Sequence, residues 1–181
     1  MDEGQRNGPF WGPTVKTDLE AIAKELSLPE FDLLLIGDGS GTTTQESCGW
    51  ACVAWNKIAD TIDMHSGAMS CGTNNFAELI PYVQAMWHFD QSYRKIATPG
   101  VKGRIEIVSD SEVTVKCGNK EYTRKGNACL WGGVEWFENN GYAIHWTHVY
   151  RNTNVFSKKC DWFAGETRIA IDKNRKNLFS S

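Results

Sequence analysis

Short apolar runs alternate along the chain with longer stretches in which apolar residues recur at helical spacing. The first strong run, FDLLLIGD at residues 31–38, is almost continuously apolar and ends in Asp38, which predicts a buried strand that meets a turn. Residues 49–56 and 62–69 predict two further strands, the first of them rich in β-branched and aromatic side chains. We expect these three strands to form an antiparallel meander.

Helical spacing of apolar residues characterises the segment from residue 74 to about residue 89. Pro81 falls inside this segment and predicts a kink unless it lies in the first turns, because proline lacks the backbone donor that the helix needs. Residues 104–110, RIEIVSD, then alternate between apolar and polar and predict a fourth strand that ends in Asp110.

The remaining elements alternate in the same way. They are a short helix from residue 111, a helix around residues 130–137 and a fifth strand over residues 143–149. A last helix is predicted over residues 156–169, with Gly165 weakening its later part. The polar, basic segment at residues 171–181 is expected to be a frayed tail.

The first thirty residues differ from the rest of the chain in their pattern of residues. Thr17 and Glu20 form a capping-box pattern that predicts a helix over residues 17–26. Phe10 and Trp11 lie upstream among glycines and prolines, and we expect them to dock this arm onto the body.

The order of elements predicts an α/β fold. Three strands, then strands alternating with helices, imply a five-stranded mixed sheet whose first three strands are antiparallel, with helices on both faces. We divide the chain into an N-terminal extension with a short helix (residues 1–30), a main domain (31–170) and a polar C-terminal tail (171–181).

Composition narrows the classes of partner. The chain has 181 residues, 19 Lys and Arg, 22 Asp and Glu and a net charge of −3, so it has no overall attraction for nucleic acid. A nucleic-acid partner would have to be held by a local basic patch or by metal ions. No apolar run approaches the length of a membrane span and the first residues are polar, so we expect a cytoplasmic monomer with no membrane partner.

Six cysteines are present, and their spacing does not match a zinc finger. Without a secretory signal we expect reduced thiols, most of them small core residues.

Four acidic residues stand at positions that favour convergence. Asp38 and Asp110 end the first and fourth strands, Glu78 lies in the first turns of the long helix, and Asp161 lies in the last helix. Four converging carboxylates would repel one another unless divalent cations neutralised them, and oxygen-only ligands favour Mg²⁺ or Mn²⁺. With 22 acids in the chain, some also end strands by chance, and Asp before Gly is a common turn former, so both readings stay open from spacing alone.

Four sequence strings resemble the acidic motifs of type 1 ribonuclease H. They are DGSG at residues 38–41, TNNFAEL at 73–79, IVSDSEV at 107–113 and KKCDWFA at 158–164. The segments between them also fit in order, from about residue 31 to residue 170. A single one of these motifs is weak evidence, whereas four in register are specific.

The resemblance implies a ribonuclease H fold and a metal-dependent endonuclease that cuts the RNA strand of RNA/DNA hybrids, leaving 5′-phosphate and 3′-hydroxyl ends. By the same resemblance, Asp38, Glu78, Asp110 and Asp161 would ligate two Mg²⁺ ions, for which Mn²⁺ could substitute. Residues that would contact the substrate are Gly39, Ser40, Thr73, Asn74 and Asn75. Hybrid recognition of this kind uses backbone and 2′-hydroxyl contacts, because sequence does not matter.

Three features depart from the family pattern. The family usually has a histidine in the loop before the last helix, where this chain has Arg151 or Asn152, and arginine cannot shuttle protons at neutral pH. The tryptophan-rich basic handle of bacterial enzymes is replaced by a shorter basic stretch from Lys116 to Lys125, which fits either a substrate patch or an ordinary solvated loop. Pro81 could also tilt the helix that carries Glu78.

Two alternatives to a hybrid-specific ribonuclease remain. One is a catalytically silent nucleic-acid-binding domain, which the missing histidine and the modest basicity favour. The other is a nuclease of the same fold that acts on DNA. A proofreading exonuclease is disfavoured, because it would carry a second acid two residues after Asp38, where this chain has Ser40.

Overall fold

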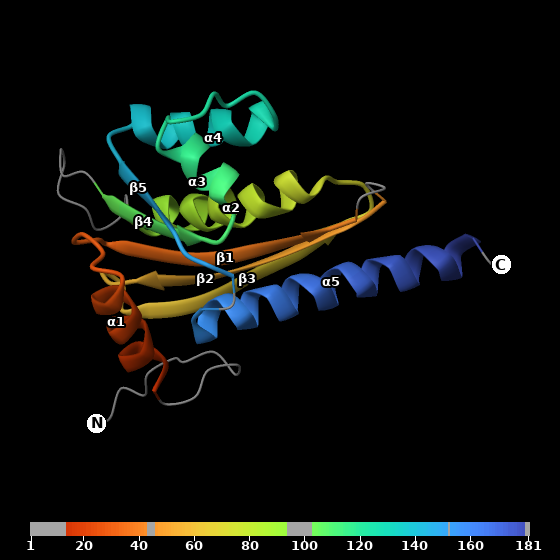
Figure 1. The fold of residues 1–181 in the computed structure, drawn as a ribbon, viewed down its shortest axis with the longest axis horizontal. Helices are drawn as coiled ribbons and strands as arrows, with labels where there is room; N and C mark the ends of the chain where they lie inside the picture. The colour runs from red at the N-terminus through yellow and green to blue at the C-terminus, as the bar shows by residue number, and fades with distance from the viewer. Residues whose placement is uncertain (1–13, 43–45, 94–102, 152, 180–181) are drawn as a thin grey trace.

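The computed structural model describes residues 14–42, 46–93, 103–151 and 153–179, and side chains as far as residue 174 (Figure 1). Phe10 and Trp11, expected to dock the N-terminal arm, lie outside the described residues. The strands are β1 (Leu33–Gly41), β2 (Cys48–Asn56), β3 (Thr61–Met69), β4 (Arg104–Ser109) and β5 (Ala143–His148). The helices are α1 (Val15–Glu25), α2 (Asn74–Tyr93), α3 (Glu112–Gly118), α4 (Ala128–Asn139) and α5 (Val155–Phe179).

The five strands form one mixed sheet in the order β3-β2-β1-β4-β5. β1 pairs antiparallel with β2, and β2 pairs antiparallel with β3, whereas β4 is parallel to both β1 and β5. The predicted mixed sheet, with its first three strands antiparallel, is therefore confirmed.

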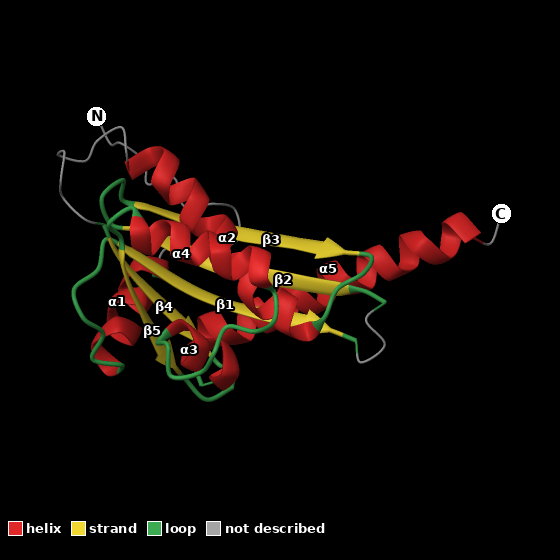
Figure 2. Ribbon diagram, turned by 90° about the horizontal axis from the view of Figure 1, so that it is seen from above, coloured by secondary structure: helices red, strands yellow, loops and turns green. Residues whose placement is uncertain are grey.

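Helices cover both faces of the sheet. Figure 1 shows α2, α3 and α4 on one face and α1 and α5 on the other, and Figure 2 shows α5 continuing past the end of the sheet. Leu33 and Leu35 of β1 are buried in the core under α2, whereas Leu34 and Ile36 are buried in the core under α1 and α5. Burial on both faces explains why this strand is a continuous apolar run. None of the helices in the described part of the chain is long and apolar enough to cross a membrane.

The N-terminal helix begins earlier than its sequence pattern predicts. α1 starts at Val15, with Thr14 at its N-cap, so Thr17 lies inside the helix and the predicted capping box is wrong. The reason is burial, because Val15 is packed into the core under α1 and α5 together with Leu19 and Ile22.

Two other helices differ from expectation in length. α5 runs to Phe179, so the residues expected to form a frayed tail are helical as far as that position. An ion pair between Arg168 and Asp172, one turn apart, supports this extension. Gly165, which was expected to weaken the helix, faces open space, since a side chain there would meet nothing within 4 Å. α2 continues through the buried Pro81 as one helix of 20 residues.

Candidate active site

β1 is longer than its neighbour β4, so the second half of β1 has an open edge. The last pair between the two strands joins Ile36 and Val108, whereas β1 continues to Gly41. The hydroxyl of Tyr82 in α2 donates to the carbonyl of Gly37 over 2.8 Å. One backbone acceptor on this open edge therefore has a side-chain partner in place of a strand. The open edge leaves room for side chains from other elements to reach the end of β1.

A glycine lets α2 approach β1 closely. A Cβ atom on Gly39 would lie 2.4 Å from the carbonyl carbon of Ala77 and 2.5 Å from the backbone nitrogen of Glu78, which no real side chain tolerates. The start of α2 therefore rests directly on β1, and Glu78 is brought next to Asp38.

Three of the predicted acids meet at this edge. One carboxylate oxygen from each of Asp38, Glu78 and Asp110 lies within 4.8 Å of the other two. Asp38 is 3% exposed and Glu78 is 7% exposed, and Asp110 follows directly after the end of β4. These residues are far apart in sequence, and only the parallel pairing of β1 with β4 and the packing of α2 bring them together.

The fourth predicted acid, Asp161, lies on α5 and is engaged by an arginine. The Nη2 atom of Arg151 lies 2.8 Å from Asp161 Oδ1, and its Nε atom lies 3.8 Å from Asp110 Oδ2. Asp161 is not part of the three-carboxylate cluster, but Arg151 connects it to that cluster. Arg151, one of the two residues that can occupy the place of the family's histidine, therefore lies as a positive charge between two of the acids.

Burial and mutual repulsion make the three clustered acids hard to ionise. Burial, reinforced by the charge of Asp110, raises the pKa of Asp38 to about 7. Burial and then the charge of Asp38 raise the pKa of Glu78 to about 8, and burial also raises the pKa of Asp110.

One atom of this cluster has no hydrogen-bond partner among the described residues. Glu78 Oε2 is buried without a hydrogen bond to any described residue. A buried carboxylate oxygen without a partner is costly, and either a proton or a cation can compensate it. The donor set consists of carboxylate oxygens only, which fits Mg²⁺ or Mn²⁺ and not a soft metal.

The residues expected to contact substrate lie at the end of β1 and at the start of α2. The backbone nitrogen of Gly39 donates to Asp38 Oδ1 over 2.7 Å. Asn74 Oδ1 accepts from the backbone nitrogen of Gly41, and its Nδ2 donates to Glu78 Oε1 over 3.3 Å. Asn74 thus links the end of β1 to one of the clustered carboxylates.

Thr73 and Asn75 flank this asparagine. The hydroxyl of Thr73 accepts from the backbone nitrogen of Phe76 and so caps the start of α2. Asn75 is exposed and lines a pocket of about 220 Å³ together with Thr114 and Trp131.

The basic stretch from residue 116 to residue 125 is largely ion-paired. Lys116 pairs with Glu112 at 2.6 Å, and its ammonium group lies over the Tyr122 ring, 5.1 Å from the ring centroid. Arg124 donates to the carbonyl oxygens of Cys117 and Gly118 at the end of α3.

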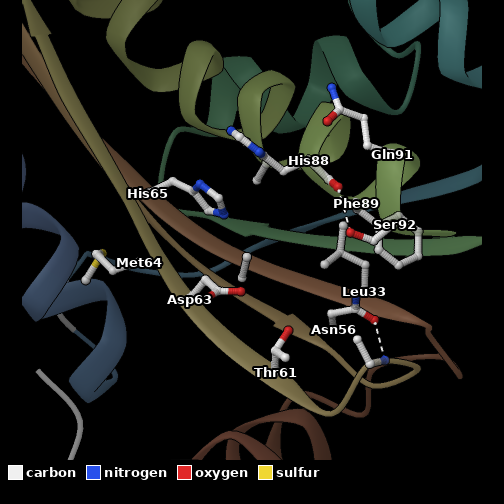
Figure 3. A pocket seen from close by; sticks show the side chains of 13 residues that line it. Leu33, Asn56, Thr61, Asp63, Met64, His65, His88, Phe89, Gln91 and Ser92 are labelled. Atoms are coloured by element: carbon white, nitrogen blue, oxygen red, sulfur yellow. Dashed lines mark hydrogen bonds between the residues drawn. The ribbon is translucent and has the colours of Figure 1, made fainter. Parts of the chain in front are cut away.

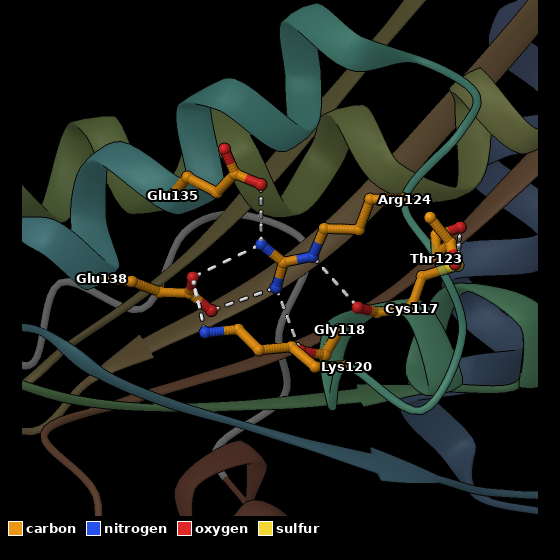
Figure 4. A network of polar contacts seen from close by, with 7 residues as sticks. All are labelled: Cys117, Gly118, Lys120, Thr123, Arg124, Glu135 and Glu138. Carbon is orange, nitrogen blue, oxygen red and sulfur yellow. Dashed lines mark hydrogen bonds and ion pairs between the residues drawn. The ribbon is translucent and has the colours of Figure 1, made fainter.

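Arg124 also lies at the centre of a wider polar network (Figure 4). It makes two hydrogen bonds to Glu138 of α4, and Lys120 pairs with the same carboxylate. This arginine connects α3 to α4 and provides hydrogen-bond donors for two backbone carbonyls at the end of α3. Much of the basic stretch therefore has a structural role that its sequence did not reveal.

Two further side chains that shape the site were missed in the sequence. Arg168 Nε donates to the hydroxyl of Ser40 over 3.1 Å, and Tyr82 fills the edge beside Gly37. Helical spacing could have indicated both, because Arg168 lies two turns after Asp161 and Tyr82 lies one turn after Glu78 on the same face.

No protein-family model matches the sequence, and a comparison with curated proteins gave no match. Solved structures do match over most of the chain. The N-terminal RNase H domain of Rv2228c from Mycobacterium tuberculosis superposes with a TM-score of 0.63 at 17% identity, over 81% of this chain and 99% of that one. The chain has a ribonuclease H-like fold.

Two other structures with this ribonuclease H-like fold agree. LC11-RNase H1, solved in complex with an RNA/DNA hybrid, gives a TM-score of 0.63 at 18% identity and covers 77% of this chain and 98% of its own. RNase H1 from the halophilic archaeon Halobacterium salinarum gives 0.54 at 18% identity, over 75% of this chain and 96% of its own. The fold that the four acidic motifs implied is therefore confirmed.

Proposed function

We propose that this protein is a metal-dependent nuclease that hydrolyses the RNA strand of RNA/DNA hybrids. The observation that carries the proposal is the cluster of Asp38, Glu78 and Asp110, in which a buried Glu78 oxygen has no partner among the described residues. The ribonuclease H-like fold supports the substrate class, because one similar structure was solved with an RNA/DNA hybrid bound.

Asp38, Glu78 and Asp110 would hold the cation, and Asp161 would join them once its ion pair with Arg151 opens. Two bound Mg²⁺ ions, with Mn²⁺ as a substitute, would supply the Lewis acidity for phosphodiester hydrolysis that leaves 5′-phosphate and 3′-hydroxyl ends. The raised pKa values of the three acids agree with this role, since a cation would replace the protons that the cluster otherwise holds.

Substrate would lie over the end of β1 and the start of α2. Asn74 bonds to Glu78 there, and Gly39, Ser40, Thr73 and Asn75 complete the set implied by the family motifs. Lys116 would contribute as a more distant cation, after exchanging Glu112 for a phosphate. These contacts address backbone and sugar groups and would make binding independent of sequence.

Arg151 would act at the same place without transferring a proton. Its guanidinium balances Asp110 and Asp161 while the cation is absent, and it can turn to a phosphate oxygen when the cation binds. Its role would then be to position substrate and to compensate charge.

Cleavage of an end-labelled RNA/DNA hybrid in Mg²⁺, in Mn²⁺ and in EDTA tests the proposal. RNA/RNA and DNA/DNA duplexes of the same sequence run alongside, together with Asp110→Asn and the matched control Asp60→Asn in the β2–β3 turn. We expect metal-dependent cutting of the hybrid's RNA strand, lost in Asp110→Asn and kept in Asp60→Asn. Cutting of the DNA duplex alone would show a DNA-directed nuclease instead.

A second candidate function is a catalytically silent nucleic-acid-binding domain of the same fold. The ion pair between Arg151 and Asp161 favours it, because a fixed positive charge there could substitute for a metal ion. This candidate predicts hybrid binding that survives EDTA, with no cleavage in either metal.

A further inference from the structure

A polar cleft lies between the edge strand β3 and the second half of α2, away from the carboxylate cluster. Its volume is about 550 Å³, and its floor is formed by Leu33 of β1 and Ala54 of β2. Figure 3 shows Asp63 and His65 on the β3 side and His88 on the α2 side of this cleft. Asp63 and His65 are two residues apart on one strand and therefore share a face.

The two histidines approach each other across the cleft. Their ring centroids are 5.0 Å apart and their ring planes are inclined by 24°. Two imidazoles that bind one tetrahedral ion through Zn–N bonds of about 2.0–2.1 Å also have centroids roughly 5 Å apart. Rotation about the last side-chain torsion of histidine is soft, so the ring nitrogens can turn toward a common point while the centroids stay in place.

The charge of the cleft favours a cation. Among the described residues that line it, Asp63 carries the only formal charge, and none is lysine or arginine. The group that coordinates a metal ion is the neutral imidazole nitrogen, and each of the two histidines offers one. An anion would find no fixed positive charge here.

We infer that His65 and His88 form a second metal site, specific for a first-row transition cation of the Zn²⁺ class, with Asp63 as an available third ligand. Imidazole nitrogen favours such ions over Mg²⁺, whereas the carboxylate cluster has the opposite preference. Asp63 would join by changing its rotamer, and water would fill the remaining position. The bound ion would fasten β3 to α2, the helix that carries Glu78.

Calorimetric titration of the full-length protein with ZnCl2, in excess Mg²⁺ to occupy the carboxylates, tests this inference. We expect one Zn²⁺ per chain and a rise in Tm with Zn²⁺, because an ion that binds only the folded state stabilises it. His65→Ala and His88→Gln should each weaken Zn²⁺ affinity at least about tenfold, whereas His145→Ala on β5 is the matched control and should not. NMR of the imidazole nitrogens should show the shifts of His65 and His88 alone responding to Zn²⁺.

Three outcomes would overturn the proposed site. The first is absence of Zn²⁺ binding, and the second is equal Zn²⁺ affinity in wild type and both variants. The third is loss of Zn²⁺ binding in Asp110→Asn, which would place the ion at the carboxylates. His88→Gln guards against misfolding, because His88 is exposed and glutamine keeps its bulk. The result is independent of the proposed nuclease function, since hybrid cleavage in Mg²⁺ is expected to be unchanged in both variants.

Discussion

The guanidinium of Arg151 lies 2.8 Å from the carboxylate of Asp161. The same guanidinium is 3.8 Å from Asp110, so one positive charge is shared between an acid of the three-carboxylate cluster and the acid on α5. This arrangement connects the loop before α5 to the site in a way that a histidine at the same position would not, because arginine stays charged at all relevant pH values.

Replacing Arg151 should change how the protein responds to metal ions. Arg151→Ala removes a cation that competes for Asp110 and Asp161, so we expect half-maximal cleavage at a lower Mg²⁺ concentration. The maximal rate should fall by no more than about tenfold, because a surface charge contact to phosphate is worth roughly 1 kcal/mol. Cleavage rates measured over a Mg²⁺ titration check both points. Arg151→Lys, which keeps the charge, should stay closer to wild type, and complete loss of activity in Arg151→Ala would contradict this role.

Stability of the metal-free protein should fall as pH rises. The folded-state pKa values of Asp38, about 7, and Glu78, about 8, lie above the ordinary range of about 3.9 to 4.3 for these groups. Between about pH 4 and pH 8 the folded state therefore holds more protons than the unfolded state, and the free energy of unfolding decreases with increasing pH. Urea denaturation at a series of pH values measures the slope.

The variant Asp38→Asn isolates this effect. It removes one buried negative charge but keeps an oxygen for the Gly39 backbone donor, so it should raise the free energy of unfolding at pH 8 by on the order of 1–3 kcal/mol. The gain should shrink toward pH 5, and Mg²⁺ should stabilise wild type more than the variant. An equal pH slope in both proteins would mean that the cluster does not hold protons.

The contact of Gly39 with α2 should not tolerate any side chain. Gly39→Ala places a Cβ atom 2.4 Å from backbone of Ala77, so α2 has to move away from β1 and Glu78 moves with it. We expect a loss of about 1–3 kcal/mol in stability and a large loss of cleavage activity. Gly132→Ala in α4 is the matched control, because its Cβ would meet nothing within 4 Å and alanine favours the helix by about 1 kcal/mol. Chemical denaturation and hybrid cleavage of both variants separate local misplacement from a general effect of alanine.

Arg124 should matter for stability and not for substrate. Lysine cannot reproduce its contacts to two backbone carbonyls and to Glu138, so Arg124→Lys should cost about 2–4 kcal/mol in the free energy of unfolding. Lys125→Ala, which removes an adjacent exposed charge, should change stability by less than about 0.5 kcal/mol. Urea denaturation compares the two, and similar stabilities would mean that the network in Figure 4 is not maintained in solution.

The order of strands and helices could be predicted from local pattern. The apolar run around Leu34 follows from burial on two faces. Arg104–Ser109 alternates although it is also buried on both faces, because the polar Glu106 is buried and bonded to His145 and Thr147. Helix ends were less predictable. Val15 extends α1 because the body of the protein buries it, and α5 continues to Phe179 although its late sequence is polar.

The four acids were also marked in the sequence, because each sits in a motif that resembles a known family. What local pattern could not determine is how these acids are paired and charged. The pKa values of Asp38 and Glu78 depend on burial by β1 and α2, and the position of Arg151 depends on where the loop before α5 crosses the site. The approach of His65 to His88 likewise exists only because α2 packs on β3.

By itself, then, the sequence determined the elements of this protein, their order and the candidate acids, since periodicity and motifs are properties of neighbouring residues. Only the tertiary structure decided which charges meet, because electrostatic and coordination energies depend on distances and burial between segments that are remote in the chain.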